Sequence, residues 1–146
     1  MFKYPKGSEW TQWDLHIHTP ATLLSNAFAG ATMEEKWDNY FSAIAASGLH
    51  AIAPTNYFCL DGTEELLLAM KNGRLGQVEC VLPNVEFRID QSNKDGTHIH
   101  VHVIFADHLC ADLQRIQEFL NSLDLTQTAT GGKVIRCTRE AVAQHG

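Results

Sequence analysis

The sequence lacks several features that would assign it to a specialised class of protein. No apolar run approaches the ~20 residues that a membrane-spanning helix needs, and the opening segment MFKYPKGSEW has no apolar core of a signal peptide. The four cysteines occur singly, with no CxxC pair, so neither a zinc knuckle nor a dithiol redox motif is indicated. We therefore expect a cytoplasmic protein with reduced cysteines and no association with membranes.

Clusters of basic residues are also missing. Lysine and arginine number 11 against 17 acidic residues, which gives a formal net charge of −6. This balance does not support a free-standing nucleic-acid-binding domain. A metal-dependent nuclease remains allowed, because a bound cation reverses the sign of the field inside its pocket. The 146 residues fit one domain with a real hydrophobic core.

Histidine, in contrast, is abundant, with 8 residues. His16 and His18 form one group, and His98, His100 and His102 form another. The spacing of two in both groups places each group on one face of a strand.

Hydrophobic periodicity and turn signals predict elements in the order β-α-β-α-β-β-α. The expected strands are 13–18, 49–54, 78–82, 85–89 and 98–105, and the expected helices are 33–47, 64–71 and 111–123. We expect turn-rich loops at 55–62 and 91–97, the second with an Asp-Gly turn. After residue 125 the pattern weakens: we expect a loop at 126–132, and residues 134–146 fit the start of either a strand or a helix. Alternating strands and helices favour an α/β fold with a largely parallel sheet and outer helices.

The segment DLHIHTP carries the clearest chemical signal. Its two imidazoles, His16 and His18, can chelate one metal ion, and they precede the Thr19-Pro20 stop at the end of a strand. Sites in α/β proteins lie at such carboxyl ends of strands. Asp14 is predicted on the same face, where it would orient a histidine ring. The alternative is an ordinary pair of strand histidines.

Glu86, at the end of the third strand, is a candidate bridge between two metals. On spacing alone it fits an exposed strand glutamate equally well. One or two of His98, His100 and His102 are candidate ligands, and the alternative for that row is a solvent-facing edge strand.

These segments resemble the PHP (polymerase and histidinol phosphatase) family. DLHIHTP resembles its first motif, VLPNVEFRI its glutamate motif and HVHVIFAD its histidine strand, in family order from Trp13 to Asp107. The sequence is similar in particular to PHP domains fused ahead of large ABC/AAA-like ATPases of DNA repair or defence systems. The family's usual Thr-Asp-His motif is replaced here by Thr55-Asn56-Tyr57, and its late Asp-x-His motif has no counterpart.

The resemblance implies a distorted (β/α)7 barrel with mostly parallel strands and outer helices. Residues 1–146 would form its N-terminal, incomplete part. It also implies one to three divalent ions (Zn, Mn or Fe) and the hydrolysis of phosphate esters, including nucleic-acid or nucleotide phosphates. The implied catalytic residues are His16, His18 and Glu86, and the implied metal ligands add His102, His100 and His98. Asp14, Asn56, Tyr57 and Asp61 are expected around the ligands or in the pocket.

Three interpretations of the function remain open at the level of sequence. A metal-dependent phosphoric ester hydrolase is favoured by the retained DLHIHTP, Glu86 and His102. A catalytically degenerate module with a docking or regulatory role is favoured by Asn56 and Tyr57. An amidohydrolase-like enzyme acting on C–N bonds shares the HxH motif. The expected partners are a phosphate-ester substrate, an ATPase domain or subunit, and a second copy of the chain that covers the open barrel edge.

Overall fold

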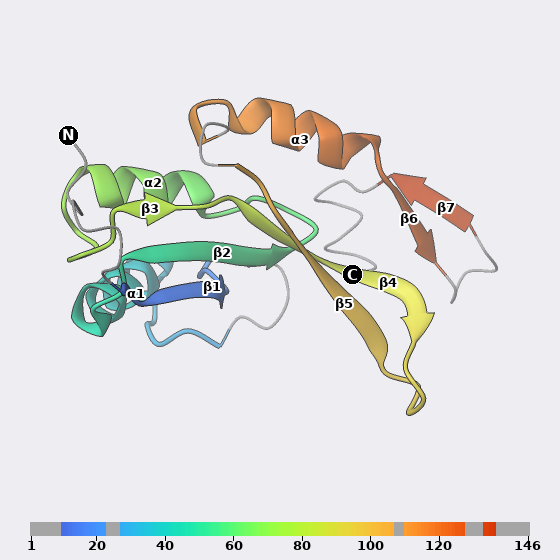
Figure 1. Ribbon diagram of the computed structural model, residues 1–146, viewed down its shortest axis with the longest axis horizontal. Helices are drawn as coiled ribbons and strands as arrows, with labels where there is room; N and C mark the ends of the chain where they lie inside the picture. Colours follow the sequence, from blue (N-terminus) through green and yellow to red (C-terminus); the bar gives the residue numbers. More distant parts are fainter. Residues whose placement is uncertain (1–9, 23–26, 107–109, 128–132, 137–146) are drawn as a thin grey trace.

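The computed structural model describes residues 10–22, 27–106, 110–127 and 133–136, with the backbone alone for 89–92, 98, 124–127 and 133–136 (Figure 1). Within this part of the chain the secondary structure alternates between strands and helices before it ends in a small hairpin. The elements are β1 (Trp13–Ile17), α1 (Met33–Ser47), β2 (Ala51–Tyr57), α2 (Thr63–Lys71), β3 (Cys80–Val81), β4 (Asn84–Ser92), β5 (His98–Ile104), α3 (Leu113–Ser122), β6 (Asp124–Gln127) and β7 (Lys133–Arg136).

The main sheet is curled and mostly parallel. Its strand order is β1-β2-β4-β5, and β3 also pairs with β2. The strands β1, β3 and β4 run parallel to β2, whereas β5 runs antiparallel to β4. Pro83 separates β3 from β4, which pair with successive parts of β2. The predicted mixed α/β fold with a largely parallel sheet is therefore confirmed, and β6 and β7 form a separate antiparallel pair.

Helix α1 begins and ends where its sequence signals predict. The side chain of Thr32 accepts a hydrogen bond from the amide of Glu35 at 3.1 Å, and the Glu35 carboxylate accepts one from the amide of Ala31 at 2.7 Å. This pair of bonds is close to the predicted capping box, with the Glu35 carboxylate bound to the amide one residue before the N-cap Thr32. Gly48 ends the helix in the left-handed conformation, with φ of 74°, which glycine adopts without steric cost.

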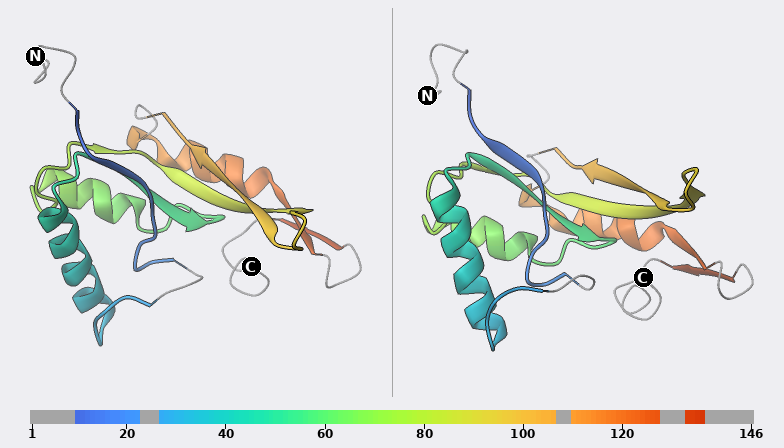
Figure 2. Two further views of the ribbon diagram at one scale, coloured as in Figure 1. Left: turned by 60° about the horizontal axis from the view of Figure 1, so that its bottom comes forward. Right: turned by 90° about the horizontal axis from the view of Figure 1, so that it is seen from below.

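The three helices of the described chain pack on the same face of the sheet (Figure 2). Helices α1 and α2 meet the face of β2 that carries Ile52, through buried residues such as Phe41 and Leu66. Helix α3 covers the same face of β4, where Ile116 and Leu120 join a cluster with Val85. Because side chains alternate along a strand, the residues next to Ile52 and Val85 face the other way. That opposite face carries Glu86 and the four histidines around it, His16, His18, His100 and His102.

Most predicted elements are confirmed, with four differences, the first of which is that β6 overlaps the start of the loop predicted at 126–132. Strand β2 continues to Tyr57, so residues 55–57 lie in the central strand and not in the predicted loop. Strand β3 covers only two residues of the predicted 78–82, and β4 extends past the predicted 85–89 to Ser92. The predicted turn is present at 93–97, with Gly96 at φ 77°. In the described segments, every helix is too short or too polar to cross a membrane.

Candidate metal centre

A β-bulge in β1 sets the direction of its two histidines. The pairing of β1 with β2 shifts register between Asp14 and Ile17, so three steps along β1 match two along β2. Such a bulge leaves backbone groups outside the ladder and re-aims the side chains that follow it. The freed carbonyl of Leu15 accepts a hydrogen bond from Nδ2 of Asn84 at 2.9 Å and lies 3.2 Å from Oγ1 of Thr55.

The imidazoles of His16 and His18 both reach the same carboxylate oxygen. Nε2 of each ring lies 3.6 Å from Oε2 of Glu86. The His16 side chain is 57% exposed and that of His18 is 24% exposed, whereas Glu86 is 1% exposed. The two histidine rings therefore cover a buried carboxylate at the carboxyl end of β1, and each turns its Nε2 atom toward that carboxylate.

Strand β5 brings further imidazoles to the same carboxylate. Glu86 pairs directly with His102 in the antiparallel register of β4 and β5, and Arg88 pairs with His100. The ring of His102 lies 4.4 Å from that of His16 between centroids, and Nδ1 of His100 contacts Oε1 of Glu86. The side chain of His98 lies outside the described residues.

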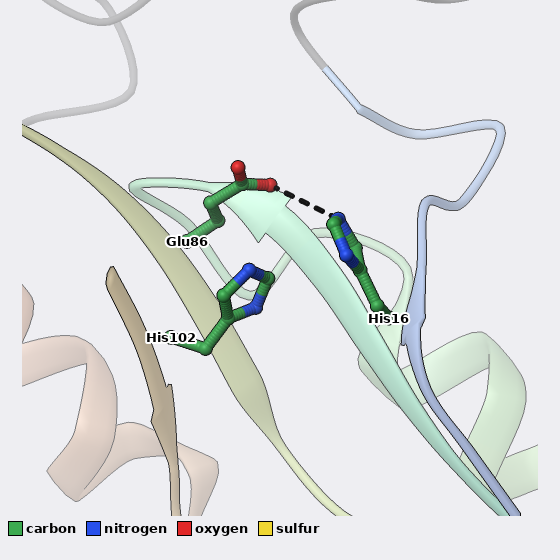
Figure 3. A group of neighbouring side chains, drawn as sticks. All are labelled: His16, Glu86 and His102. Atoms are coloured by element: carbon green, nitrogen blue, oxygen red, sulfur yellow. Dashed lines mark ion pairs between the residues drawn. The ribbon is translucent and has the colours of Figure 1, made fainter. Parts of the chain in front are cut away.

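Three side chains meet as a metal-binding group would. One ligand atom from each of His16, Glu86 and His102 lies within 4.8 Å of the others, and the three come from β1, β4 and β5 (Figure 3). Ligand atoms that share one zinc ion at ~2.0–2.1 Å are separated by roughly 3 to 3.5 Å. Small side-chain rotations would thus suffice, and this group can hold a metal ion.

The environment of Glu86 fits a cation. A buried carboxylate is costly unless charge or hydrogen bonds compensate it. In the described part of the chain, Oε2 of Glu86 accepts no hydrogen bond, and the ionic partners of this residue are imidazoles only. A divalent cation would supply the missing charge, and two imidazoles with a carboxylate are a donor set that zinc, manganese and iron accept.

The protonation of His18 also suits ligation. Burial lowers the pKa of this imidazole below its ordinary 6.5; the charge of Glu86 opposes the shift, and His16 and His102 add to it. A lowered pKa keeps the ring neutral near pH 7, and neutral imidazole is the form that binds metal.

Tyr57 forms one wall of the site. Its ring stacks on that of His18, with centroids 5.1 Å apart, and meets the ring of His100 edge-on at 6.0 Å. The guanidinium carbon of Arg88 lies 4.5 Å from the Tyr57 ring centroid, as in a cation–π contact. The expectation that Tyr57 lines the pocket agrees with this placement, although Tyr57 reaches it from a strand.

Asn56 and Asp61 lie on the other side of β2. Asn56 pairs with Val85, on the face that the helices cover. Its Oδ1 accepts a hydrogen bond from the Thr19 amide at 3.1 Å, and its Nδ2 donates to Oγ1 of Thr19 at 2.8 Å and to the carbonyl of Asp61. Asn56 thus ties the segment after β1 to the segment after β2, and none of these contacts involves a histidine ring.

Asp14 makes a different contact from the one its spacing predicts. Its carboxylate accepts a hydrogen bond from the backbone amide of His16 at 3.0 Å. Asp14 pairs with Ile52, ahead of the bulge, which puts it in register with the helix-covered face. Burial raises the pKa of Tyr40 on α1, and the Asp14 charge adds to that shift. The prediction of a shared face with His16 is wrong because the bulge interrupts the alternation.

Reasoning from sequence missed three residues of the site. Asn84 and Thr55 are fully buried polar residues that hold the bulge, joined by a hydrogen bond of 2.7 Å from Nδ2 of Asn84 to Oγ1 of Thr55. The sequence signal for both was a polar residue beside apolar strand residues: Thr55 directly after the apolar run of β2 and Asn84 directly before the apolar residues of β4. Arg88 was missed too, although its spacing of two from Glu86 places it on the same strand face.

Comparison with known proteins provides no family assignment. The chain matches no model of a known protein family and, at a significant level, none of the curated proteins searched.

Proposed function

We propose that this domain is a PHP-type, metal-dependent phosphoesterase, with His16, His18, Glu86 and His102 as the metal ligands. The observation that carries the proposal is the buried carboxylate of Glu86, whose Oε2 lies 3.6 Å from two imidazole nitrogens and accepts no hydrogen bond in the described structure. The curled, mostly parallel sheet with helices on one face is compatible with the N-terminal part of a (β/α)7 barrel.

A divalent metal held by these residues would supply positive charge, which would stabilise a phosphoryl group in its transition state and lower the pKa of a bound water. The protein's own groups prepare the site. The lowered pKa of His18 keeps a lone pair available, and the contact of His100 with Oε1 of Glu86 fixes the carboxylate so that Oε2 faces His16 and His18. Tyr57 stacks on His18 and restricts its rotation.

The substrates in this proposal are esters of phosphate, including nucleotide or nucleic-acid ends, within a larger ATPase-linked system. The net charge of −6 allows this class, because a metal-filled site would be a local positive region in an otherwise acidic chain. One observation favours the alternative of a degenerate docking or regulatory module. Asn56, which stands where the family has an Asp, is fully engaged away from the histidines.

The test combines metal analysis with hydrolysis. Purified protein would be stripped with chelator, reloaded with Zn²⁺ or Mn²⁺, and assayed by elemental analysis and with p-nitrophenyl phosphate, its bis ester and 5′-phosphorylated oligonucleotides. We expect His16→Ala to lose both metal and hydrolysis. His50→Asn is the matched control, because His50 precedes β2 at the opposite end from Tyr57 and should keep both.

The outcomes separate the hypotheses. Metal binding without hydrolysis of any ester would replace the enzyme with the docking module. Hydrolysis of amides or cyclic ureides, with no action on phosphate esters, would favour the amidohydrolase-like alternative. Equal metal content in the wild-type and His16→Ala proteins would refute the proposed site itself.

A further inference from the structure

Arg88 is a cationic group on the face of the metal centre that the ligand set does not use. It lies on β4 two residues after Glu86, so the two side chains share a strand face. In the β4–β5 register it stands opposite His100, whose ring contacts Glu86. The Arg88 side chain is exposed, and its guanidinium lies over Tyr57, the ring that stacks on His18.

A comparison with Arg74 shows what Arg88 lacks. Both guanidinium groups lie over an aromatic ring, at 4.6 Å from Phe41 for Arg74 and at 4.5 Å from Tyr57 for Arg88. Arg74 is neutralised by Asp38, at 2.7 Å between Nη2 and Oδ1. Among the described side chains, no carboxylate forms an ion pair with Arg88. Its planar set of N–H donors therefore keeps its capacity for an oxyanion.

We propose that Arg88 is the anion-recognition residue of this site and that it binds the non-bridging oxygens of a phosphomonoester dianion. The inference rests on the proposed function, which supplies the phosphate ester. The contact with the ring of Tyr57 restrains the guanidinium, which favours its fork for two parallel N–H···O bonds. A doubly charged terminal phosphate gains most from this pairing, a phosphodiester gains less, and a neutral ester gains nothing.

The first test measures binding without turnover. Inorganic phosphate would be titrated into the full chain, loaded with one equivalent of Zn²⁺, by isothermal calorimetry. Charge-assisted hydrogen bonds of this kind predict that Arg88→Gln weakens phosphate binding by about tenfold or more. Arg88→Lys should be intermediate, because it keeps the charge and loses the fork. The matched control Arg74→Gln, on the helix side of the sheet, should bind phosphate as the wild type does.

The second test is selectivity. We expect Arg88→Gln to raise KM for p-nitrophenyl phosphate by a larger factor than KM for bis(p-nitrophenyl) phosphate, with zinc content and far-ultraviolet circular dichroism unchanged. Equal phosphate affinity in the wild type and Arg88→Gln, or no phosphate binding by the wild type at millimolar concentration, would overturn the assignment.

The two proposals fail in different ways. If the chain hydrolyses no ester but binds phosphate through Arg88, the anion site stands and the hydrolase is refuted. If hydrolysis needs His16 while Arg88→Gln changes neither affinity nor selectivity, the hydrolase stands and the role of Arg88 is refuted.

Discussion

Replacing Glu86 by Gln tests the metal centre with the smallest change in shape. The side chain is 1% exposed, so an amide of the same size avoids the cavity that alanine would leave. The substitution removes the negative charge that His16 and His18 approach at 3.6 Å. It leaves the two imidazoles in place, so any loss of metal reports on the carboxylate.

The expected magnitude follows from linkage between binding and folding. A ligand present at a hundred times its Kd stabilises the folded state by about 2.7 kcal/mol. For a chain of this length, that corresponds to a rise in melting temperature of roughly 10 °C. We expect the wild type to show this rise with Zn²⁺ or Mn²⁺ and Glu86→Gln to lose most of it. The metal-free Glu86→Gln protein should be at least as stable as the metal-free wild type, because a buried neutral amide is less costly than a buried charge.

The assay is thermal unfolding followed by circular dichroism, with chelator and with a metal series, alongside elemental analysis. His50→Asn serves as the control and should keep the full metal-induced shift. A metal-induced shift of equal size in Glu86→Gln and the wild type would refute the reasoning, since the ion would then bind elsewhere.

Three further predictions follow from the contacts around the site. Burial lowers the pKa of His18, so this ring takes up a proton at higher pH in the unfolded chain than in the folded chain. The free energy of unfolding of the metal-free protein should therefore decrease as pH falls below about 6.5. Urea titrations should show a flatter pH dependence for His18→Asn. Asn56→Asp removes the donor that serves Thr19 and Asp61, so it should cost about 1–3 kcal/mol of unfolding free energy without raising bound metal; a higher metal stoichiometry would place this residue among the ligands after all. Asn84→Ala removes the hydrogen bond to the Leu15 carbonyl that holds the bulge. In competition with a chelating dye, this variant should bind metal roughly 10–100-fold more weakly than the wild type, and the control Asn39→Ala on α1 should bind it as the wild type does.

Local signals in the sequence were sufficient for most elements of the fold. Thr32 and the glycine at position 48 mark the two ends of α1, because the Thr32 side chain binds a free amide of the first turn and Gly48 adopts the left-handed conformation that ends the helix. The strict alternation of polar and apolar residues at 98–103 marks β5. The predicted second strand ends three residues before β2 does, because Thr55-Asn56-Tyr57 has the polar composition of a loop. Its polar side chains are buried only because tertiary partners, such as Asn84 for Thr55, satisfy them.

The grouping of the candidate ligands was predictable from the sequence, and the contacts that support them were less so. A spacing of two was enough to put His16 with His18 and His100 with His102, because strand geometry imposes that period. The position of Asp14 was not predictable, since a bulge depends on hydrogen bonds to residues about 70 positions away, such as the 2.9 Å bond from Asn84 to Leu15. Arg88 was overlooked because its interest lies in having no ion-pair partner among the described side chains, which a sequence does not display.

The antiparallel pairing of β4 with β5 has a consequence for how the protein folds. Glu86, His100 and His102 belong to one hairpin with a turn at 93–97, and hairpins of this kind form in microseconds. His16 and His18 join only when β1 docks beside β2, a parallel pairing between distant segments, which is intrinsically slower. We therefore expect the site to assemble in two stages. Metal added at the start of refolding would meet a hairpin that already presents two of the four proposed ligands, Glu86 and His102, and the two histidines of β1 would complete the site last.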